Sequence, residues 1–284
     1  MKIPARLQAL VDDGVIDEVL GQLMSGKEAQ VYIVRCGAHT RCAKVYKEAD
    51  KRSFRQAAQY QEGRKFRNSR TARAAGKHSR FGQKEMEQAW LTAEVDALRR
   101  LAAADVRVPA THGFVDGVLL MDMIQDEDGG PAPRLNDVTL TPELAREYHA
   151  RLLVDIVKML CAGIVHGDLS EFNVLLSSTG PVIIDLPQAV NAAGNNQAAA
   201  MLLRDVENMA RYFGRFAPEL RNTQYGAEIW SLYEKGILRP TSPLSGRFEG
   251  KLESADVDTV LQIIADARAE HERELERRAE AESS

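Results

Sequence analysis

The spacing of apolar residues along the chain changes near residue 125. Before that point, apolar and polar residues alternate over short runs, as half-buried strands require. Two helical stretches interrupt these runs, an amphipathic segment at 5–11 and a longer helix at 85–102. Asp116-Gly117 is a strong hairpin signal between the last two runs. The expected strands are 15–23, 30–36, 41–46, 113–115 and 118–123.

After residue 140 the spacing favours helices. Thr141 is suited to an N-cap and Pro142 to the first helical position, so a long helix is expected over 143–162. Two short apolar runs, 174–176 and 182–184, read as strands. Asp, Gly and Pro dominate 125–133, which is therefore the expected hinge. The remaining expected helices are 198–213, 224–236 and 255–282.

This order of elements predicts an α+β chain with two lobes. The N-lobe, 1–124, is expected to be small and mainly antiparallel β, with the 85–102 helix packed beside it. The C-lobe, 125–253, is expected to be mainly helical. A charged helical tail, 254–284, completes the chain.

Composition narrows the class of protein. The chain has 284 residues, of which 44% are hydrophobic and 27% charged, as in ordinary globular proteins. No apolar run approaches the roughly 18–20 residues of a membrane span, and the acidic first residues do not resemble a signal peptide. The cysteines, Cys36, Cys42 and Cys161, form no CxxC pair. We therefore expect a cytoplasmic protein with no membrane contact.

Charge is distributed unevenly. The net charge is −4, yet residues 44–84 carry 13 Lys and Arg against three acids, Glu48, Asp50 and Glu62. The tail beyond Ser254 is rich in Glu and Asp. Such runs usually form solvated loops, but a basic insert over 51–84 also suits contact with RNA.

The stretch HGDLSEFNVLLSSTGPVIID, 166–185, carries most of the candidate chemistry. The five-residue step from Asp168 to Asn173 equals the spacing in protein-kinase catalytic loops, and Asp185 follows an apolar strand. Asp168 is expected to orient an attacking hydroxyl as a catalytic residue. Asn173 and Asp185 are expected to bind Mg²⁺, with Mn²⁺ as the alternative ion. A structural role, packing near Asp185, is favoured for His166.

Lys44 lies among apolar neighbours in an expected strand, and an inward lysine needs a partner. Glu94 on the 85–102 helix is the favoured partner, and Glu87 is the competitor. Such a pair would fix the phosphates of a nucleotide. Ser25 and Lys27, in a turn between two strands, are expected to contact the same phosphates. Backbone groups of Met121, Asp122 and Ile124 are expected to pair with an adenine edge.

Taken together, these segments resemble the RIO family of atypical serine/threonine protein kinases. The resemblance covers nearly all of the chain to about residue 213. Its most specific motifs are HGDLSEFN and GKEA-x-VY. The segments that carry it are SGKEAQVY (25–32), KVYK (44–47), W-x-x-x-E (90–94), LLMDMI (119–124), GGPAPRL (129–135), HGDLSEFNVL (166–175), IIDLPQAV (183–190) and LLRDVENMARYF (202–213).

The resemblance implies a trimmed bilobal kinase fold that binds ATP with Mg²⁺ and phosphorylates protein serine or threonine. It also implies that Asp185 can become an aspartyl-phosphate, so that turnover resembles ATP hydrolysis, and that the protein autophosphorylates. Archaeal and eukaryotic relatives act in maturation of the small ribosomal subunit, which makes a ribosomal contact through 51–84 an expectation. Asp185-Leu186-Pro187 replaces the Asp-Phe-Gly of ordinary kinases, and no Ala-Pro-Glu follows.

Two other interpretations stay open from the sequence. A small-molecule phosphotransferase of the aminoglycoside- or choline-kinase type shares HGD-x-x-x-x-N. An RNA- or ribosome-binding module could use the same site as a nucleotide switch. The physiological protein substrate is not indicated by any motif.

Overall fold

The computed structural model describes residues 3–26, 29–47 and 80–249, with backbone alone for 80–91. Contacts divide the chain into two compact units. The first unit runs to Val138 and also contains Asn173–Ala189, whereas the second contains Thr139–Phe172 and the residues from Val190 onward. The expected boundary at residue 125 differs from this division. The expected tail, 254–284, lies outside the described residues.

Backbone hydrogen bonds explain why 173–189 belongs to the first unit. This segment forms a hairpin of β7 (Val174–Ser177) and β8 (Gly180–Ile183). The Ile183 N–H donates to the Arg107 carbonyl at 2.9 Å, and the Leu176 N–H donates to the Pro133 carbonyl at 2.9 Å. The expected hinge, 125–133, is thereby hydrogen-bonded to the β7–β8 hairpin within the first unit.

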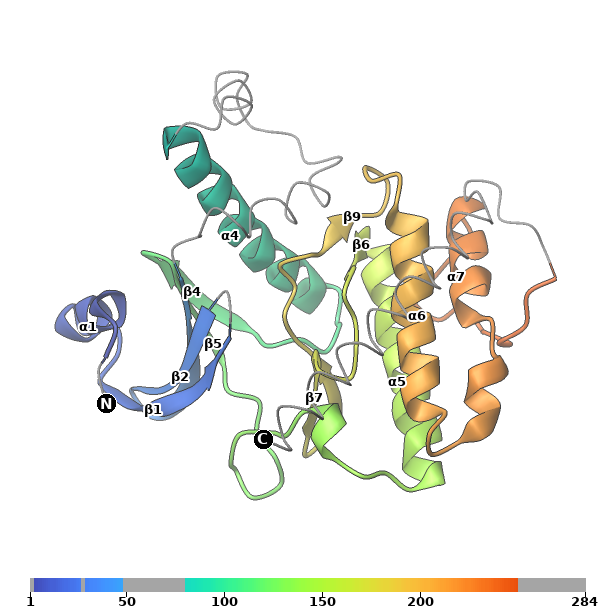
Figure 1. The fold of residues 1–284 in the computed structure, drawn as a ribbon, viewed down its shortest axis with the longest axis horizontal. Helices are drawn as coiled ribbons and strands as arrows, with labels where there is room; N and C mark the ends of the chain where they lie inside the picture. Colours follow the sequence, from blue (N-terminus) through green and yellow to red (C-terminus); the bar gives the residue numbers. More distant parts are fainter. Residues whose placement is uncertain (1–2, 27–28, 48–79, 250–284) are drawn as a thin grey trace, which may run out of the picture. The chain divides into compact units, whose positions relative to one another are not determined.

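A five-stranded antiparallel sheet with strand order β1-β2-β3-β5-β4 forms the centre of the first unit (Figure 1). Asp116 and Gly117 connect β4 to β5 with positive φ of 48° and 75°, the conformation that the Asp-Gly signal predicts. The strands are β1 (Glu18–Ser25), β2 (Ala29–Cys36), β3 (His39–Tyr46), β4 (Thr111–Val115) and β5 (Val118–Asp122).

One face of this sheet carries the hydrophobic core of the unit. Helix α1 (Ala5–Asp12) places Leu7 and Leu10 against Tyr32, Ala43 and other buried strand residues. The first strand begins at Glu18, three residues later than expected. Gly14 with φ 71° turns the chain there, and the Val15 N–H donates to the Leu10 carbonyl. Ile16, fully buried, still packs in this core.

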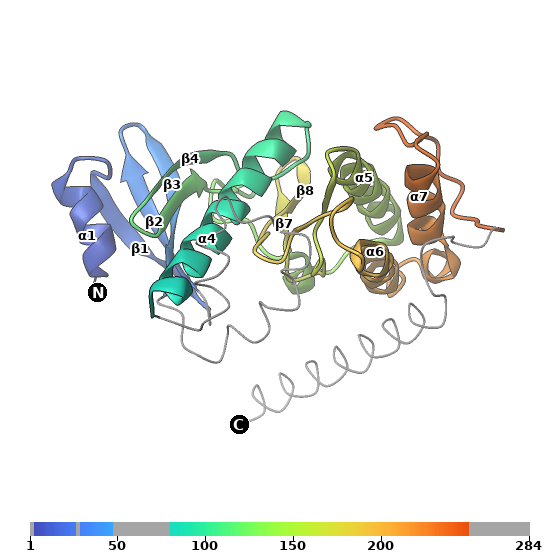
Figure 2. The ribbon, with the colours of Figure 1, turned by 90° about the horizontal axis from the view of Figure 1, so that it is seen from above.

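The other face of the sheet is covered by α4 (Arg80–Ala103), as Figure 2 shows. Alternation along β3 places Lys44 on this face, opposite to Ala43 and Val45 of the core. The helix begins five residues earlier than expected, so 80–84 are helical rather than part of the basic insert. Residues 51–79 of that insert lie outside the described residues.

The second unit is mainly helical. Helices α5 (Pro142–Cys161), α6 (Ala198–Phe213) and α7 (Tyr225–Glu234) pack on one another. The Thr141 hydroxyl accepts a hydrogen bond from the Leu144 N–H, which confirms the predicted cap. A small sheet of β6 (Ile164–Val165) and β9 (Val190–Asn191) flanks the 166–172 loop. Across the part of the chain that the structure describes, no helix is long and apolar enough to cross a membrane.

Candidate functional site

Lys44 is the central charge of the site in the first unit. Its Nζ lies 2.7 Å from Glu94 Oε1 and 2.7 Å from Asp185 Oδ1. Burial acts to lower the pKa of Lys44, but the carboxylates of Glu94 and Asp185 outweigh it and hold the pKa well above its ordinary value. Lys44 is therefore a permanent cation. The structure brings together the lysine and glutamate that the sequence pairs; the Glu87 side chain lies outside the described residues.

Glu94 has a second partner that sequence reasoning missed. The buried Tyr46 hydroxyl donates to Glu94 Oε2 at 2.5 Å. Burial raises the pKa of Tyr46 well above its usual value, and the Glu94 carboxylate adds to this effect, so the phenol stays a donor. The alternation of β3 contains the signal, because Tyr46 is two residues from Lys44 and faces the same side. Both oxygens of a carboxylate that is 3% exposed are thus satisfied.

Asp185 and Asn173 lie at one end of the β7–β8 hairpin. The Ile184 N–H donates to the Asn173 carbonyl at 2.9 Å, which fixes the residues before Asp185. Asp185 itself has φ 65°, an unusual conformation for a residue other than glycine. This turn leaves the Asp185 side chain 46% exposed. One carboxylate and one amide oxygen form a hard-oxygen donor set, which is the chemistry that Mg²⁺ prefers.

No cluster of three or more His, Cys, Asp or Glu with metal-binding geometry occurs among residues 3–26, 29–47 and 92–249. The Asn173–Asp185 pair fits an ion that takes its other ligands from phosphate oxygens and water, as Mg²⁺ commonly does.

Ser25, expected to contact phosphates, is the last residue of β1. The Gly26 N–H donates to the Ala29 carbonyl at 2.9 Å, and Lys47 Nζ donates to the Gly26 carbonyl at 2.6 Å. Lys47, at the end of β3, thus brings a second cation next to Gly26, which sequence reasoning missed. Lys27 lies outside the described residues.

The segment expected to meet adenine ends β5. The Asp122 N–H donates to the Ala110 carbonyl and the Ile124 carbonyl accepts from the Ala132 N–H, both at 2.9 Å. These two groups are committed to the protein. The Asp122 N–H and the Ile124 carbonyl are therefore not open to an adenine edge. Met121 pairs with Cys42 inside the sheet.

Asp168 belongs to the second unit, in a loop whose backbone is held by α6. The Gly167 and Leu169 N–H groups donate to the two oxygens of Asp205 at 2.8 and 2.9 Å. Asp168 itself is exposed between these buried neighbours. Its own N–H donates to His166 Nδ1 at 3.3 Å, so His166 orders the loop from within. The arrangement presents one carboxylate on a fixed backbone.

Two other α6 side chains bond to carbonyls of this loop. Arg204 donates to the Gly167 carbonyl, and Asn208 Nδ2 donates to the Leu169 carbonyl at 3.0 Å. Burial raises the pKa of Asp205 to about 7, against Arg204 and the two N–H donors, which lower it. The sequence signal for these contacts is a charged pair, Arg204-Asp205, within a helix that has a buried face.

The amino-acid sequence was compared with protein families and with individual proteins. Residues 30–225 match the model of the RIO domain. The chain is 34% identical over 218 residues to the RIO-type serine/threonine-protein kinase Rio1 of Haloferax volcanii, covering 74% of this chain and 68% of that one. It is 32% identical to the Methanocaldococcus jannaschii protein of that name, covering 70% and 64%.

A human relative, serine/threonine-protein kinase RIO1, is 31% identical over 71% of this chain and 34% of its own length. The chain thus spans between about a third and two thirds of the curated relatives it matches. Among solved structures, the crystal structure of a kinase domain covers 72% of this chain and 65% of its own, with 13% identity and a TM-score of 0.41.

Proposed function

Because this chain belongs to the RIO-domain family, we propose that it is an ATP-dependent serine/threonine protein kinase that uses Mg²⁺. The observation that carries the proposal is the partly buried ammonium of Lys44 between Glu94 and Asp185. A permanent cation held by a carboxylate on a helix is the arrangement that positions nucleotide phosphates in kinases. The three free cysteines suit a reducing compartment such as the cytoplasm.

Each residue of the site has a part in this proposal. Lys44 binds phosphate oxygens, and Asp122–Ile124 contacts the adenine edge through its backbone. Asn173 and Asp185 hold Mg²⁺, which neutralises charge on the phosphates when bound. Asp168 accepts the proton of the attacking hydroxyl. Its rigid backbone supports this role, because a misplaced base loses much of its effect.

We further propose that Asp185 accepts the phosphoryl group in a side reaction. Its exposed carboxylate oxygen forms a bond to the γ-phosphorus while the bond to the bridging oxygen breaks and ADP leaves. Water then attacks the acyl phosphate, and inorganic phosphate departs. Turnover through this route is ATP hydrolysis, whereas transfer to serine is the kinase reaction.

Two variants test the roles of the carboxylates with γ-labelled ATP. Asp168→Asn is expected to retain nucleotide binding and slow transfer by roughly 10²–10⁴-fold. Asp185→Asn is expected to lose Mg²⁺-dependent nucleotide binding and any hydroxylamine-labile label. Asp96→Asn, at an exposed position of α4, is the matched control. Full activity of both site variants would refute the proposed chemistry.

The acceptor is identified in the same assay. Serine peptides, aminoglycosides, choline and the protein itself are offered to the wild-type chain. Label on peptide or protein serine supports a protein kinase, and label on an aminoglycoside or choline would support the small-molecule phosphotransferase. Serine label without any hydroxylamine-labile label would remove the aspartyl-phosphate.

A further inference from the structure

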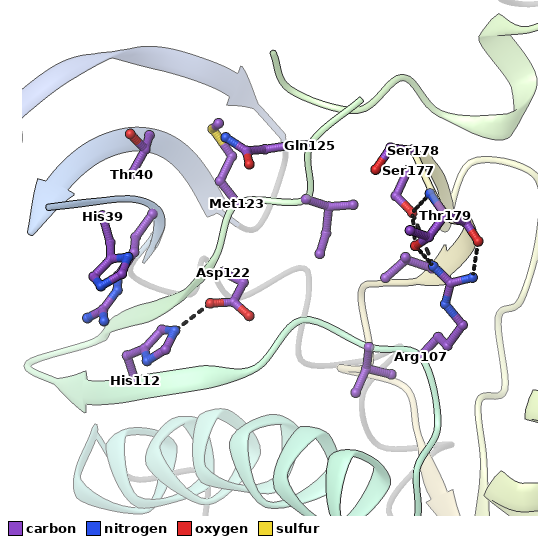
Figure 3. Close-up of a pocket in the computed structure, with 14 residues that line it drawn as sticks. His39, Thr40, Arg107, His112, Asp122, Met123, Gln125, Ser177, Ser178 and Thr179 are labelled. Atoms are coloured by element: carbon purple, nitrogen blue, oxygen red, sulfur yellow. Dashed lines mark hydrogen bonds and ion pairs between the residues drawn. The ribbon is translucent and has the colours of Figure 1, made fainter. Parts of the chain in front are cut away.

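A cavity in the first unit lies beside the segment Asp122–Ile124 and away from Lys44. Its volume is about 670 Å³, and none of Lys44, Glu94 and Asp185 lines it. Figure 3 shows His39 and Thr40 on one side, and Arg107 with the Ser177–Thr179 turn on the other. The connection that follows β5, from Asp122 to Gln125, passes between these two sides.

Each side of this cavity carries an arginine. Arg41 comes from the start of β3, near His39, and Arg107 comes from the segment between α4 and β4. Arg107 is fixed in position, since it donates to the Thr179 carbonyl at 2.7 Å and the Thr179 hydroxyl at 2.6 Å. Its Nη2 also donates to the Ser177 hydroxyl at 3.1 Å and to the Gly180 carbonyl at 3.4 Å, so the guanidinium is held beside the cavity. Asp122, the acid in the lining, is paired with His112 at 2.5 Å.

Apolar side chains lie between the charged sides. Met123, Ile124 and Val108 are partly exposed and line the cavity together with Val182. No Phe, Tyr or Trp occurs in the lining. Single-stranded nucleic acid is usually bound by a row of cations with aromatic rings for the bases, so this lining suits it poorly. An extended peptide with acids flanking an apolar residue matches the order of charge, apolar surface and charge.

We propose that this cavity docks an extended acidic segment of a protein partner, with a carboxylate on each charged side and an apolar side chain on Met123 and Ile124. In terms of the proposed kinase function, the partner is the protein substrate, held away from the phosphoryl-transfer residues. A docking site of this kind holds the substrate through a segment other than the one that carries the acceptor serine. It also raises the effective concentration of the acceptor serine.

Binding is tested with fluorescent peptides in which two glutamates flank a leucine at increasing spacing, using anisotropy and the full chain. The best spacing is expected to bind about tenfold more tightly than its double-glutamine version, because charge-assisted hydrogen bonds are lost in the latter. His39→Glu, at an exposed position of the cavity lining, should weaken binding of the glutamate peptide by about tenfold. Arg41→Gln should weaken its binding by a similar factor.

Arg35→Gln is the matched control, because Arg35 is an exposed arginine of the neighbouring strand that pairs with Glu18 and does not line the cavity. His39→Glu is also tested with a peptide that has lysine at the glutamate on that side, and this swap should restore binding. Equal binding of glutamate and glutamine peptides, or equal loss in Arg35→Gln, would overturn the proposal. Tighter binding of oligo-uridine, lost in His39→Glu, would assign the cavity to nucleic acid instead.

The link to phosphorylation has its own readout. Joining the docking sequence to a serine acceptor should lower KM about tenfold while kcat stays constant, since only uniform binding is added. His39→Glu should remove that advantage and leave phosphorylation of the unjoined acceptor unchanged. If no acceptor is phosphorylated, the kinase proposal fails while the anisotropy result still decides docking. A KM that is insensitive to the docking sequence would refute the substrate role.

Discussion

At the residue scale, the position of Lys44 depends on a carboxylate that is itself held from two sides. Lys44 donates to one oxygen of Glu94 and the Tyr46 hydroxyl donates to the other. The Tyr46 ring is also fixed, lying edge-on to Phe114 with centroids 6.3 Å apart. Tyr46 is therefore a positioning residue for Glu94, and through it for Lys44, the proposed phosphate-binding cation.

Tyr46→Phe tests this role. The ring and its contact with Phe114 remain, but a buried carboxylate oxygen loses its donor, which costs about 1–3 kcal/mol of stability. We expect kcat to fall about tenfold, because Glu94 then holds the Lys44 ammonium less firmly in place. Tyr148→Phe on α5 is the control, and kinetics indistinguishable from it would rule out positioning by Tyr46.

Asp205 positions the 166–172 loop, which carries the proposed catalytic Asp168, with both carboxylate oxygens. Asp205→Asn keeps the shape but leaves one acceptor for two N–H groups, so turnover should fall about tenfold while KM for ATP is retained. The raised pKa adds a pH signature. The stability from this group is fully present below its ordinary pKa of 3.8 and is lost as pH rises to about 7.

Unfolding free energies of the wild type and Asp205→Asn, measured from pH 4 to 8, test that signature. The wild type should lose stability relative to the variant as the pH rises through this range. Parallel curves would show that Asp205 has the same protonation in the folded and unfolded chain.

At the element scale, packing of α5 on α6 and α7 buries a histidine. His149, 2% exposed, lies against Phe213 and Tyr225 with ring centroids 5.6 and 5.7 Å apart. Burial lowers its pKa from 6.5 to about 4. The packing of α5 against α6 and α7 therefore contains His149 in its neutral form.

Because of this histidine, we expect the second unit to lose stability as the pH falls. Its stability contribution is present above pH 6.5 and is lost as pH falls toward 4, on the order of 3 kcal/mol for such a shift. His149→Phe keeps a ring in the aromatic cluster and should flatten the pH dependence of unfolding in this window. The control is His112→Phe at the cavity in the first unit, and an unchanged slope in His149→Phe would disprove the assignment.

At the scale of the whole molecule, charge is separated along a chain whose net charge is only −4. The basic run over 44–84 suits RNA phosphates. If it binds single-stranded RNA, affinity should fall with salt at a slope of about 0.7 per phosphate contact. Neutralising Arg64, Lys65, Arg67 and Arg70 should reduce the slope by about 3.

Electrophoretic or anisotropy titrations at several salt concentrations measure this slope. Neutralising the exposed Arg99 and Arg100 on α4 is the control and should leave the slope unchanged. Salt-independent affinity, or equal effects of the two sets, would exclude the basic run as an RNA contact.

The sequence determined the features that depend on near neighbours. Alternation in β3 predicted an inward Lys44, Thr141 predicted the start of α5, and Asp116-Gly117 predicted the β4–β5 turn. The α+β class with an antiparallel sheet followed from the same periodicities, and the motifs from 166 to 185 indicated the family. Several element ends differ from the expected ones, as at Glu18 and Arg80, where a turn or a helix extension depends on its surroundings. The short β6–β9 pair was not predicted.

Only the tertiary structure decided which groups hold these residues in place. Tyr46 and Glu94 are 48 positions apart, and Gly167 and Asp205 are 38 apart. Periodicity reports burial of a face, but it does not say which polar groups meet there, because that depends on sheet register and on how helices pack. The cavity beside Arg107 is decided in the same way, since its lining comes from segments that folding alone brings together.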